Sequence, residues 1–323
     1  MRALLDHPRF WLFAPFVGLM CLCLVAFGFW HMAASRITDQ LAANGLSWQQ
    51  LTRHGFPARI TLQMQAPRYR NKDFLWQIDK ASATLMPFNH GHAVFDFTGT
   101  HRLSTDDGRL TLAHQGNLMS LVRDANGLLR ASFDVQAPRI NAGTNNIDRR
   151  VSAAHATLHL RRAEAESNEE PRLDVALTAR DLHLNAPQAA RPIERLDVTL
   201  NVPRHVMQQK LGSGDRVKLQ RMTLQRGALT LIARGTVRLA EDGFVAGRLD
   251  LDLVNRQALL DALVEWRLIR PEARRQTELL IGLASAFGGD TQDRLSLPLS
   301  FKGGRIFLGP IELAAAPRWR GAR

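Results

Sequence analysis

Residues 10–30 form an uninterrupted apolar segment, which constrains the fold more than any other part of the sequence. Phe10 to Trp30 holds no charged residue over 21 positions. An α-helix of that length spans about 30 Å, the thickness of the hydrocarbon core of a bilayer. Trp11 and Trp30 stand near its two ends, where indole rings favour the headgroup layer. The sequence therefore predicts a transmembrane anchor at residues 10–30.

The charges before this segment predict its orientation. Arg2 and Arg9 precede it, with Asp6 as the only acid, so residues 1–9 are expected to form a cytoplasmic tail and the rest to be exported. The alternative is a cleavable signal peptide, because residues 33–35 (Ala-Ala-Ser) are small enough for cleavage. The apolar segment is longer than the roughly 7–15 residues of a signal core, and bulky residues crowd its end, which favours a retained anchor.

Cysteine and charge content exclude several classes of protein. Cys21 and Cys23 lie inside the anchor, so the exported part has no cysteine for a disulfide scaffold or a cysteine-based zinc site. Lys+Arg 42 against Asp+Glu 30 gives a net charge of +12. A basic domain tethered beside a bilayer is attracted to anionic headgroups. We therefore expect the membrane as a partner and no nucleic acid.

Residues 31–55 are predicted to form a short helical connector. Ser47 is a suitable N-cap for a helix through Leu51, and Gly55 stands where such a helix would end.

From Phe56 onward the apolar period changes from 3.6 to 2, which is typical of half-buried strands. Many strands with one apolar and one polar face favour an antiparallel sheet with one dry face. The predicted fold class is mainly β: a long, curved, mostly antiparallel sheet within an exported domain at residues 56–317. The alternating segments are 59–65, 93–97, 109–112, 131–135, 156–160, 173–177, 182–184, 196–200, 217–253, 295–301 and 305–308.

Glycines between these segments are interpreted as turns, and this makes residues 217–253 a meander of neighbouring strands. The glycines concerned are Gly227, Gly235, Gly243 and Gly247. An acidic stretch, residues 164–171, leaves two interpretations open: an exposed loop within one continuous β domain, which we favour, or a linker between two domains.

A helical hairpin is predicted at residues 256–287, packed near the C-terminal end of the sheet, with Pro271 starting its second helix. Its first helix places Leu259, Leu260, Leu263, Val264 and Leu268 on one side, and its second runs through Leu279, Leu280, Leu283 and Phe287. Residues 318–323 form a short basic tail.

Several of these features together resemble a known family. They are the anchor, the entry Gly55-Phe56-Pro57 into the first strand with Arg59 after it, the meander with its helical hairpin, and the closing residues 303–310 (Gly-Gly-Arg-Ile-Phe-Leu-Gly-Pro). The chain is similar over nearly its whole length to the Gram-negative envelope family listed as domain of unknown function 2125. The resemblance implies an inner-membrane protein with its bulk in the periplasm, and no catalytic residues. The sheet also resembles, in architecture alone, AsmA-like lipid-handling proteins.

Residues that could carry chemistry do not form a recognisable site. His90 with His92, and His155 with His159, each share a strand face, yet no carboxylate or cysteine pattern completes a metal site. Residues 212–214 (Gly-Ser-Gly) fit a polar turn and not a nucleophile elbow. Asp250 and Asp252 fall on the solvated face of a strand. We therefore assign no catalytic, cofactor-binding or metal-binding residue.

The leading hypothesis is a non-catalytic, anchored protein that binds lipid or another apolar ligand on the dry face of its sheet. The alternative is a scaffolding protein with a filled core, which binds partners at sheet edges or on its basic surface. An enzyme ranks third. Residues expected toward the dry face, for which ordinary core packing is the competing interpretation, are Ile60, Leu62, Met64, Phe95, Phe97, Leu249, Leu251, Ile306 and Leu308.

Overall fold

The computed structural model consists of two compact units, residues 1–109 and 110–323. It describes residues 8–86, 89–106, 108–144, 147–164, 170–184, 191–207, 211–265, 270–279, 282, 294–309, 311–316 and 318.

The first unit begins with one long helix, α1 (Pro8–Ala43). Residues 15–43 of this helix are long and apolar enough to cross a membrane. The side chains of Phe16, Leu22 and Phe29 are 69%, 65% and 65% exposed. The predicted apolar helix is therefore confirmed, and it extends thirteen residues past Trp30 without a break.

Short antiparallel strands complete the first unit. One group pairs in the order β2–β3–β6–β7 and another in the order β1–β4–β5–β8. Their bounds are β1 (Leu46–Ser47), β2 (Gln50–His54), β3 (Ile60–Gln65), β4 (Arg68–Arg70), β5 (Phe74–Gln77), β6 (Lys80–Met86), β7 (Asn89–Thr98) and β8 (His101–Thr105).

The helical connector expected at residues 31–55 is correct only up to Ala43. Beyond it the chain forms β1 and β2: Ser47 pairs with Arg68 instead of capping a helix, and Leu51 pairs with Met64. In β2 half-buried residues alternate with exposed ones, so Leu51 and Arg53 share one face. Burial of that face against the sheet outweighs the weak helical preference of the segment.

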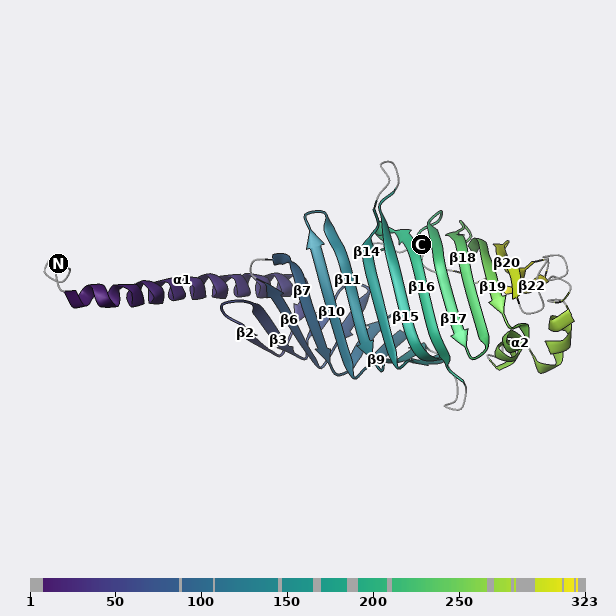
Figure 1. Cartoon of the computed structure of the whole chain (residues 1–323), viewed down its shortest axis with the longest axis horizontal. Helices are drawn as coiled ribbons and strands as arrows, with labels where there is room; N and C mark the ends of the chain where they lie inside the picture. The colour runs from purple at the N-terminus through teal and green to yellow at the C-terminus, as the bar shows by residue number, and fades with distance from the viewer. Residues whose placement is uncertain are drawn as a thin grey trace. The chain divides into compact units, whose positions relative to one another are not determined.

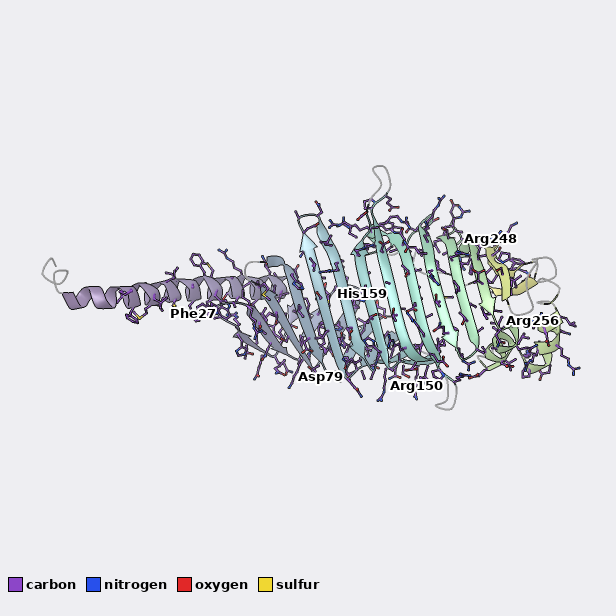
Figure 2. The ribbon with its side chains drawn as sticks, viewed as in Figure 1. Phe27, Asp79, Arg150, His159, Arg248 and Arg256 are labelled. Carbon is purple, nitrogen blue, oxygen red and sulfur yellow. The ribbon has the colours of Figure 1, made fainter. Side chains whose placement is uncertain are left out.

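A bend connects the two groups of strands in the first unit. Ala66, with φ +47°, ends β3, and its N–H donates to the carbonyl oxygen of Asp79 at 2.8 Å. The N–H of Ile78 donates to the carbonyl oxygen of Pro67 at 3.2 Å. The Asp79 carboxylate (labelled in Figure 2) accepts from Arg102 at 2.9 Å and from the N–H of Thr100 at 3.2 Å, and these hydrogen bonds lower its pKa.

The second unit is a broad antiparallel sheet, in which β10, β11, β14 to β20, β21 and β22 pair in that order (Figure 1). This confirms the predicted fold class and the alternating strands. The bounds are β10 (Gly116–Asp124), β11 (Gly127–Gln136), β12 (Arg139–Thr144), β13 (Ile147–Ser152), β14 (His155–Arg162), β15 (Arg172–Leu184), β16 (Ile193–Pro203), η2 (Arg204–Met207), β17 (Arg216–Arg226), β18 (Leu229–Leu239), β19 (Val245–Val254), α2 (Arg256–Glu265), β20 (Arg294–Lys302), β21 (Arg305–Leu308) and β22 (Ile311–Ala315); β9 (Gly108–Ala113) spans the border between the units.

The second unit repeats the bend of the first. The sequence Gln-Ala-Pro-Arg occurs at residues 65–68 and again at 136–139. Ala137, with φ +46°, ends β11, and its N–H donates to the carbonyl oxygen of Ala154 at 2.8 Å, while the N–H of Ala153 donates to the carbonyl oxygen of Pro138 at 3.1 Å. These bonds match those of Ala66 and Ile78. The segments β2–β3–β4 and β10–β11–β12 are therefore two copies of one arrangement.

Two of the four predicted glycine turns are wrong. Gly227 and Gly243 lie between strands, but Gly235 pairs with Leu249 inside β18 and Gly247 pairs with Val237 inside β19. A Cβ on Gly235 would stand 2.3 Å from the carbonyl oxygen of Arg248, and its φ of +149° suits glycine alone. These glycines allow two backbones to approach closely within the sheet, which in sequence looks the same as a turn.

The helical hairpin at residues 256–287 is found in part. Its first helix is α2, followed by the short η3 (Pro271–Ala273) and by helical residues 274–279. Leu260 is fully buried, whereas Leu279, which was predicted to continue the apolar side, is 69% exposed. Leu268, Leu280, Leu283, Phe287 and residues 319–323 of the basic tail lie outside the described residues.

The strands on either side of the acidic stretch pair with each other. Arg162, the last residue of β14, lies opposite Leu173 in β15. Residues 162 and 173 are thus neighbours in the sheet of the second unit. The border between the two compact units falls after Arg109, inside the range 56–317 that was expected to form one β-rich domain.

Candidate functional site

The most distinctive feature of the second unit is a face of its sheet on which apolar residues stand side by side. Directly paired residues share a face, so the register identifies rows that cross the strands. Two such rows run across β10, β11 and β14 to β20, and we call them together the apolar strip. The first row is Met119, Phe133, Leu158, Leu177, Val198, Met222, Ala233, Leu251 and Leu297, and the second is Leu121, Ala131, Leu160, Val175, Leu200, Leu219, Gly235, Leu249 and Leu299.

In the middle of the apolar strip the first row is only half-buried, whereas Ala131 and Leu219 of the second row are 2% and 8% exposed. Phe133, Leu158, Val198 and Met222 retain intermediate exposure, and Leu177 is 36% exposed. All five lie on inner strands with neighbours on both sides, so their exposure comes from the direction perpendicular to the sheet. A side chain in a filled core of two layers would be almost fully buried. The first row of the strip on β11 and β14 to β17 therefore lacks a covering layer among the described residues.

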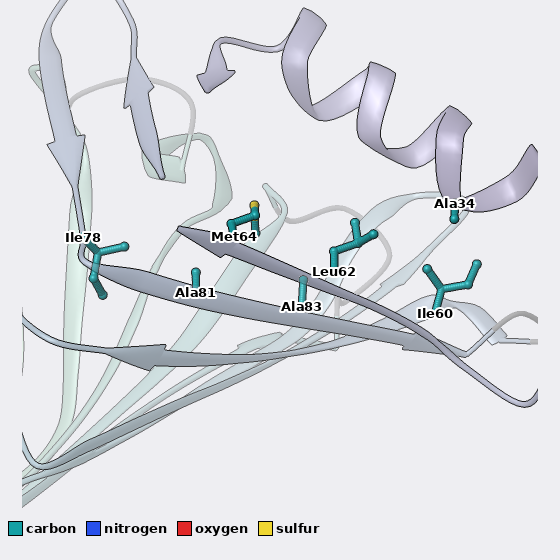
Figure 3. Packing of buried hydrophobic residues seen from close by; sticks show 7 residues of the cluster. All are labelled: Ala34, Ile60, Leu62, Met64, Ile78, Ala81 and Ala83. Carbon is teal, nitrogen blue, oxygen red and sulfur yellow. The ribbon is translucent and has the colours of Figure 1, made fainter. Parts of the chain in front are cut away.

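The matching face of the first unit is covered. When the two copies of the bend are superposed by sequence, Leu62 and Ala83 correspond to Phe133 and Leu158. Leu62 is 0% and Ala83 2% exposed, because α1 packs on them through Ala34, which is itself fully buried (Figure 3). The same position in the same arrangement is thus buried under a helix in one unit and half-exposed in the other.

Cover is present at one end of the apolar strip. Leu260 and Ala262 of α2 pack with Leu229, Leu253 and Leu297 in a buried cluster. Arg226, whose side chain is 6% exposed, forms an ion pair with Glu265 and donates to the carbonyl oxygen of Arg191 at 3.1 Å. These contacts fix α2 over β18 to β20 and the end of β17.

The opposite face of the second unit is polar and solvated. Ion pairs and hydrogen bonds connect neighbouring strands there, such as His159 to the Ser132 hydroxyl at 3.0 Å and Arg234 to Asp252 at 3.3 Å (Figure 2 labels His159). Arg248 also contacts Asp250 at 3.0 Å within β19. Exposed pairs of this kind contribute little to stability. This face of the sheet is therefore a solvated surface.

Charged residues gather where β10, β14 and β16 end. Arg162 donates two hydrogen bonds to Asp124, at 2.6 and 2.8 Å, and these lower the pKa of the Asp124 carboxyl. His205, just after β16, lies between two carboxylates: Nε2 is 2.9 Å from Asp215 and Nδ1 is 3.0 Å from Glu170. The hydrogen bond to Asp215, followed by that to Glu170, raises the pKa of His205.

A cavity of about 510 Å³ opens beside these groups, lined by the β10–β11 turn, the end of the acidic stretch and η2. Its charged lining residues are Arg123, Glu170, Arg204 and His205. Sequence reasoning missed this cluster because its members come from three separate connections, and no spacing in the sequence announces their meeting.

The residues predicted for the dry face divide between the two units. Ile60, Leu62 and Met64 are core residues under α1, with Phe95 and Phe97 packed against them, which is the competing interpretation given above. Leu249 and Leu251 lie in the apolar strip, and Leu308 pairs with its last member, Leu299. The set thus contains both a filled core and an open face.

The histidine pairs give no metal centre. His155 and His159 lie on one face of β14 as predicted, yet His155 contacts Asp134 at 3.1 Å and His159 contacts Ser132, so their partners differ. The side chain of His90 lies outside the described residues. Within the described ranges no group of three or more His, Cys, Asp or Glu side chains is placed to hold a metal ion.

Residues 27–317 match the family described as "Uncharacterized protein conserved in bacteria (DUF2125)", and the chain belongs to this family. The match covers most of the chain and confirms the resemblance inferred from the anchor, the entry into the first strand and the closing residues. No curated protein and no solved structure matches the chain.

Proposed function

We propose that this member of the DUF2125 family is a membrane-anchored periplasmic protein that binds lipid acyl chains on the apolar strip of its second unit. The observation that carries the proposal is the contrast between corresponding residues. Phe133 and Leu158 are half-exposed where Leu62 and Ala83 are buried under α1. A face that the chain covers with its own apolar helix in one unit needs an apolar cover in the other as well.

The side chains of the strip favour a thin ligand over a second helix. Ala83 belongs to the core cluster that includes Ala34 of α1, and its small side chain leaves room for a helix about 10 Å across; Leu158 at the matching position is larger. An acyl chain is thinner than a helix and fits over the larger side chains. At about 4.8 Å per strand, the six strands β10, β11 and β14 to β17 give the open part of the strip a length of about 24 Å, longer than the roughly 15 Å of one leaflet's hydrocarbon.

The free-energy balance suits reversible binding. Each methylene kept away from water is worth about 0.8 kcal/mol, but a lipid in the bilayer already has this benefit. Transfer from bilayer to strip is therefore nearly neutral for the lipid, and the favourable part comes from covering the exposed strip. Such a site would exchange lipid with the membrane and would not trap it.

Contacts made by α1 support a retained anchor. Trp30 donates from Nε1 to the carbonyl oxygen of Arg59 at 2.8 Å, and Phe27 stacks edge-on against Phe56 with ring centroids 5.4 Å apart. Ala34, in the middle of the candidate cleavage site, is fully buried in the core. Cleavage there would cut a helix that the first unit needs for its core, so we assign α1 to the mature protein, with residues 1–9 in the cytoplasm.

Lipid analysis of the purified full chain tests the proposal. The protein is extracted from membranes in a mild detergent, and the lipid that remains bound is counted per protein by mass spectrometry. We expect at least one lipid per chain. The substitution Leu177→Arg should lower this number severalfold, because it places a charge in the middle of the strip, while the 36% exposure of Leu177 allows the variant to fold.

Thr178→Arg is the matched control, because Thr178 is the next residue of β15 and faces the polar side opposite Asp197. It should leave the lipid count unchanged. Absence of bound lipid from the wild-type chain, together with a protein that binds at the same strip, would favour the scaffolding alternative. Equal loss in both variants would mean that the lipid is held elsewhere.

A further inference from the structure

The cavity of about 510 Å³ beside the β10–β11 turn is lined by Arg123, near the end of β10. The β10–β11 pairing contains a bulge, and its extra residue lies on β11, between Arg130 and Leu128. The regular alternation of β10 through Met119, Leu121 and Arg123 is therefore not interrupted. Side chains two residues apart in a strand share a face, so Arg123 points to the face of Leu121. A chain lying on the strip thus reaches the cavity at the end of β10.

The charges of the cavity favour an anion. Arg123 and Arg204 contribute two guanidinium groups; that of Arg204 donates to the carbonyl oxygen of Asn126. The only carboxylate in the described lining is that of Glu170, which is 3.0 Å from His205. Nearby Asp124 pairs with Arg162, and Asp215 accepts from both His205 and the N–H of Gly212. Within the described residues, Arg123 forms no ion pair.

We propose that this cavity binds the phosphate of a lipid headgroup whose acyl chains lie on the apolar strip. A phosphate offers oxygens that guanidinium groups bind through charge-assisted, bidentate hydrogen bonds, and the partly buried Leu128 in the lining continues the apolar surface toward the glycerol. The inference deepens the proposed function and rests on it, since it names the class of lipid: one with an anionic phosphate.

Two lipids that differ only in the phosphate test the inference: didecanoyl phosphatidic acid and didecanoyl glycerol. Binding of each to the full-length protein in detergent is measured by native mass spectrometry. We expect the phosphatidic acid to bind at least tenfold more tightly. Arg123→Gln with Arg204→Gln should remove most of this preference and leave binding of didecanoyl glycerol unchanged. Arg123→Gln alone should remove part of the preference for phosphatidic acid. Because the Arg123 side chain is exposed, this single variant is expected to fold even if the double variant does not.

The matched control is Arg130→Gln with Arg221→Gln, which removes two exposed charges from the polar face. It should keep the preference for phosphatidic acid. Loss of the preference in this control would overturn the inference, because the general charge of the protein would then suffice. Equal affinity of the wild-type chain for the two lipids would also overturn it while leaving the proposed function intact.

Free phosphate is the other source of the same chemistry, and a competition separates the two. Inorganic phosphate at millimolar concentration should not displace the phosphatidic acid. Displacement would assign the cavity to a soluble phosphate compound and contradict a lipid ligand. If neither lipid binds, the proposed function itself fails.

Discussion

Arg53 in β2 donates a hydrogen bond from Nη2 to the hydroxyl oxygen of Thr38 in α1 at 3.3 Å. Thr38 is 4% exposed and donates in turn to the carbonyl oxygen of Ala34 at 2.5 Å. A second bond from Arg53, to Ser35 at 3.3 Å, fixes the same turn of the helix. These bonds attach the sheet of the first unit to the long apolar helix α1.

A double-mutant cycle with Arg53→Met and Thr38→Val measures this attachment. Each single change should destabilise the chain, and the two together should cost about 1 kcal/mol less than their sum, because a charge-assisted hydrogen bond is lost only once. Urea unfolding of the full chain in detergent gives the four free energies of unfolding. A coupling near zero would contradict the packing of α1 on β2.

The mature protein should keep its N-terminal helix. Cleavage at residues 33–35 would remove Trp30 from its hydrogen bond to Arg59 and break the helix at the fully buried Ala34. Intact-mass measurement of the protein extracted from membranes should therefore give the mass of the chain that includes residues 10–30. A mass that begins near Ser35 would show that the segment is a signal peptide.

Gly235→Ala should destabilise the chain by about 1–3 kcal/mol, because a Cβ at φ +149° meets the backbone of Arg248 and Leu249. Gly116→Ala is the control: its Cβ would have only ordinary contact with Gln136, at 3.5 Å, and its effect should stay within about 0.5 kcal/mol of zero. Thermal unfolding of both variants provides the comparison. Equal effects would mean that the close approach of β18 and β19 is unimportant.

Sequence reasoning predicted the strands because the alternation of apolar and polar residues is the same whether the apolar face is covered or open. For the same reason it did not show which apolar face is open: Leu62 and Phe133 look alike in sequence, and only the position of α1 distinguishes them. The short strand β2 was assigned to a helix because its pairing with β3 is a tertiary contact. The sequence repeats Gln-Ala-Pro-Arg at residues 65–68 and 136–139. This repeat was not used in the sequence analysis, although it indicates the two copies of the bend.

The cluster around His205 was beyond such reasoning. Glu170 and Asp215 lie 35 and 10 residues from it and meet it only through the pairing of β14 to β17. Polar residues in connections are common, and no local pattern distinguishes these from solvated ones. The cavity beside them is thus a product of the topology.

His205 should make stability depend on pH. Asp215 and Glu170 raise the pKa of His205 in the folded chain. The stabilisation by the charged imidazole is therefore fully present below about pH 6.5, the usual pKa of histidine in an unfolded chain. It is lost as the pH rises through the pKa of the folded state. The melting temperature of His205→Gln should therefore lie below that of the wild type at pH 6, and the two should converge at pH 9. A difference that stays constant with pH would contradict the ion pairs.

The central claim is that lipid lies on the apolar strip, and photo-crosslinking in living cells tests it most directly. A photoreactive amino acid replaces Val175 in one variant and Ala176 in the other; the two residues are neighbours in β15, both half-buried, and point to opposite faces. We predict that position 175 crosslinks to lipid and position 176 does not. Equal crosslinking at both positions, or crosslinks from 175 to protein alone, would contradict the account.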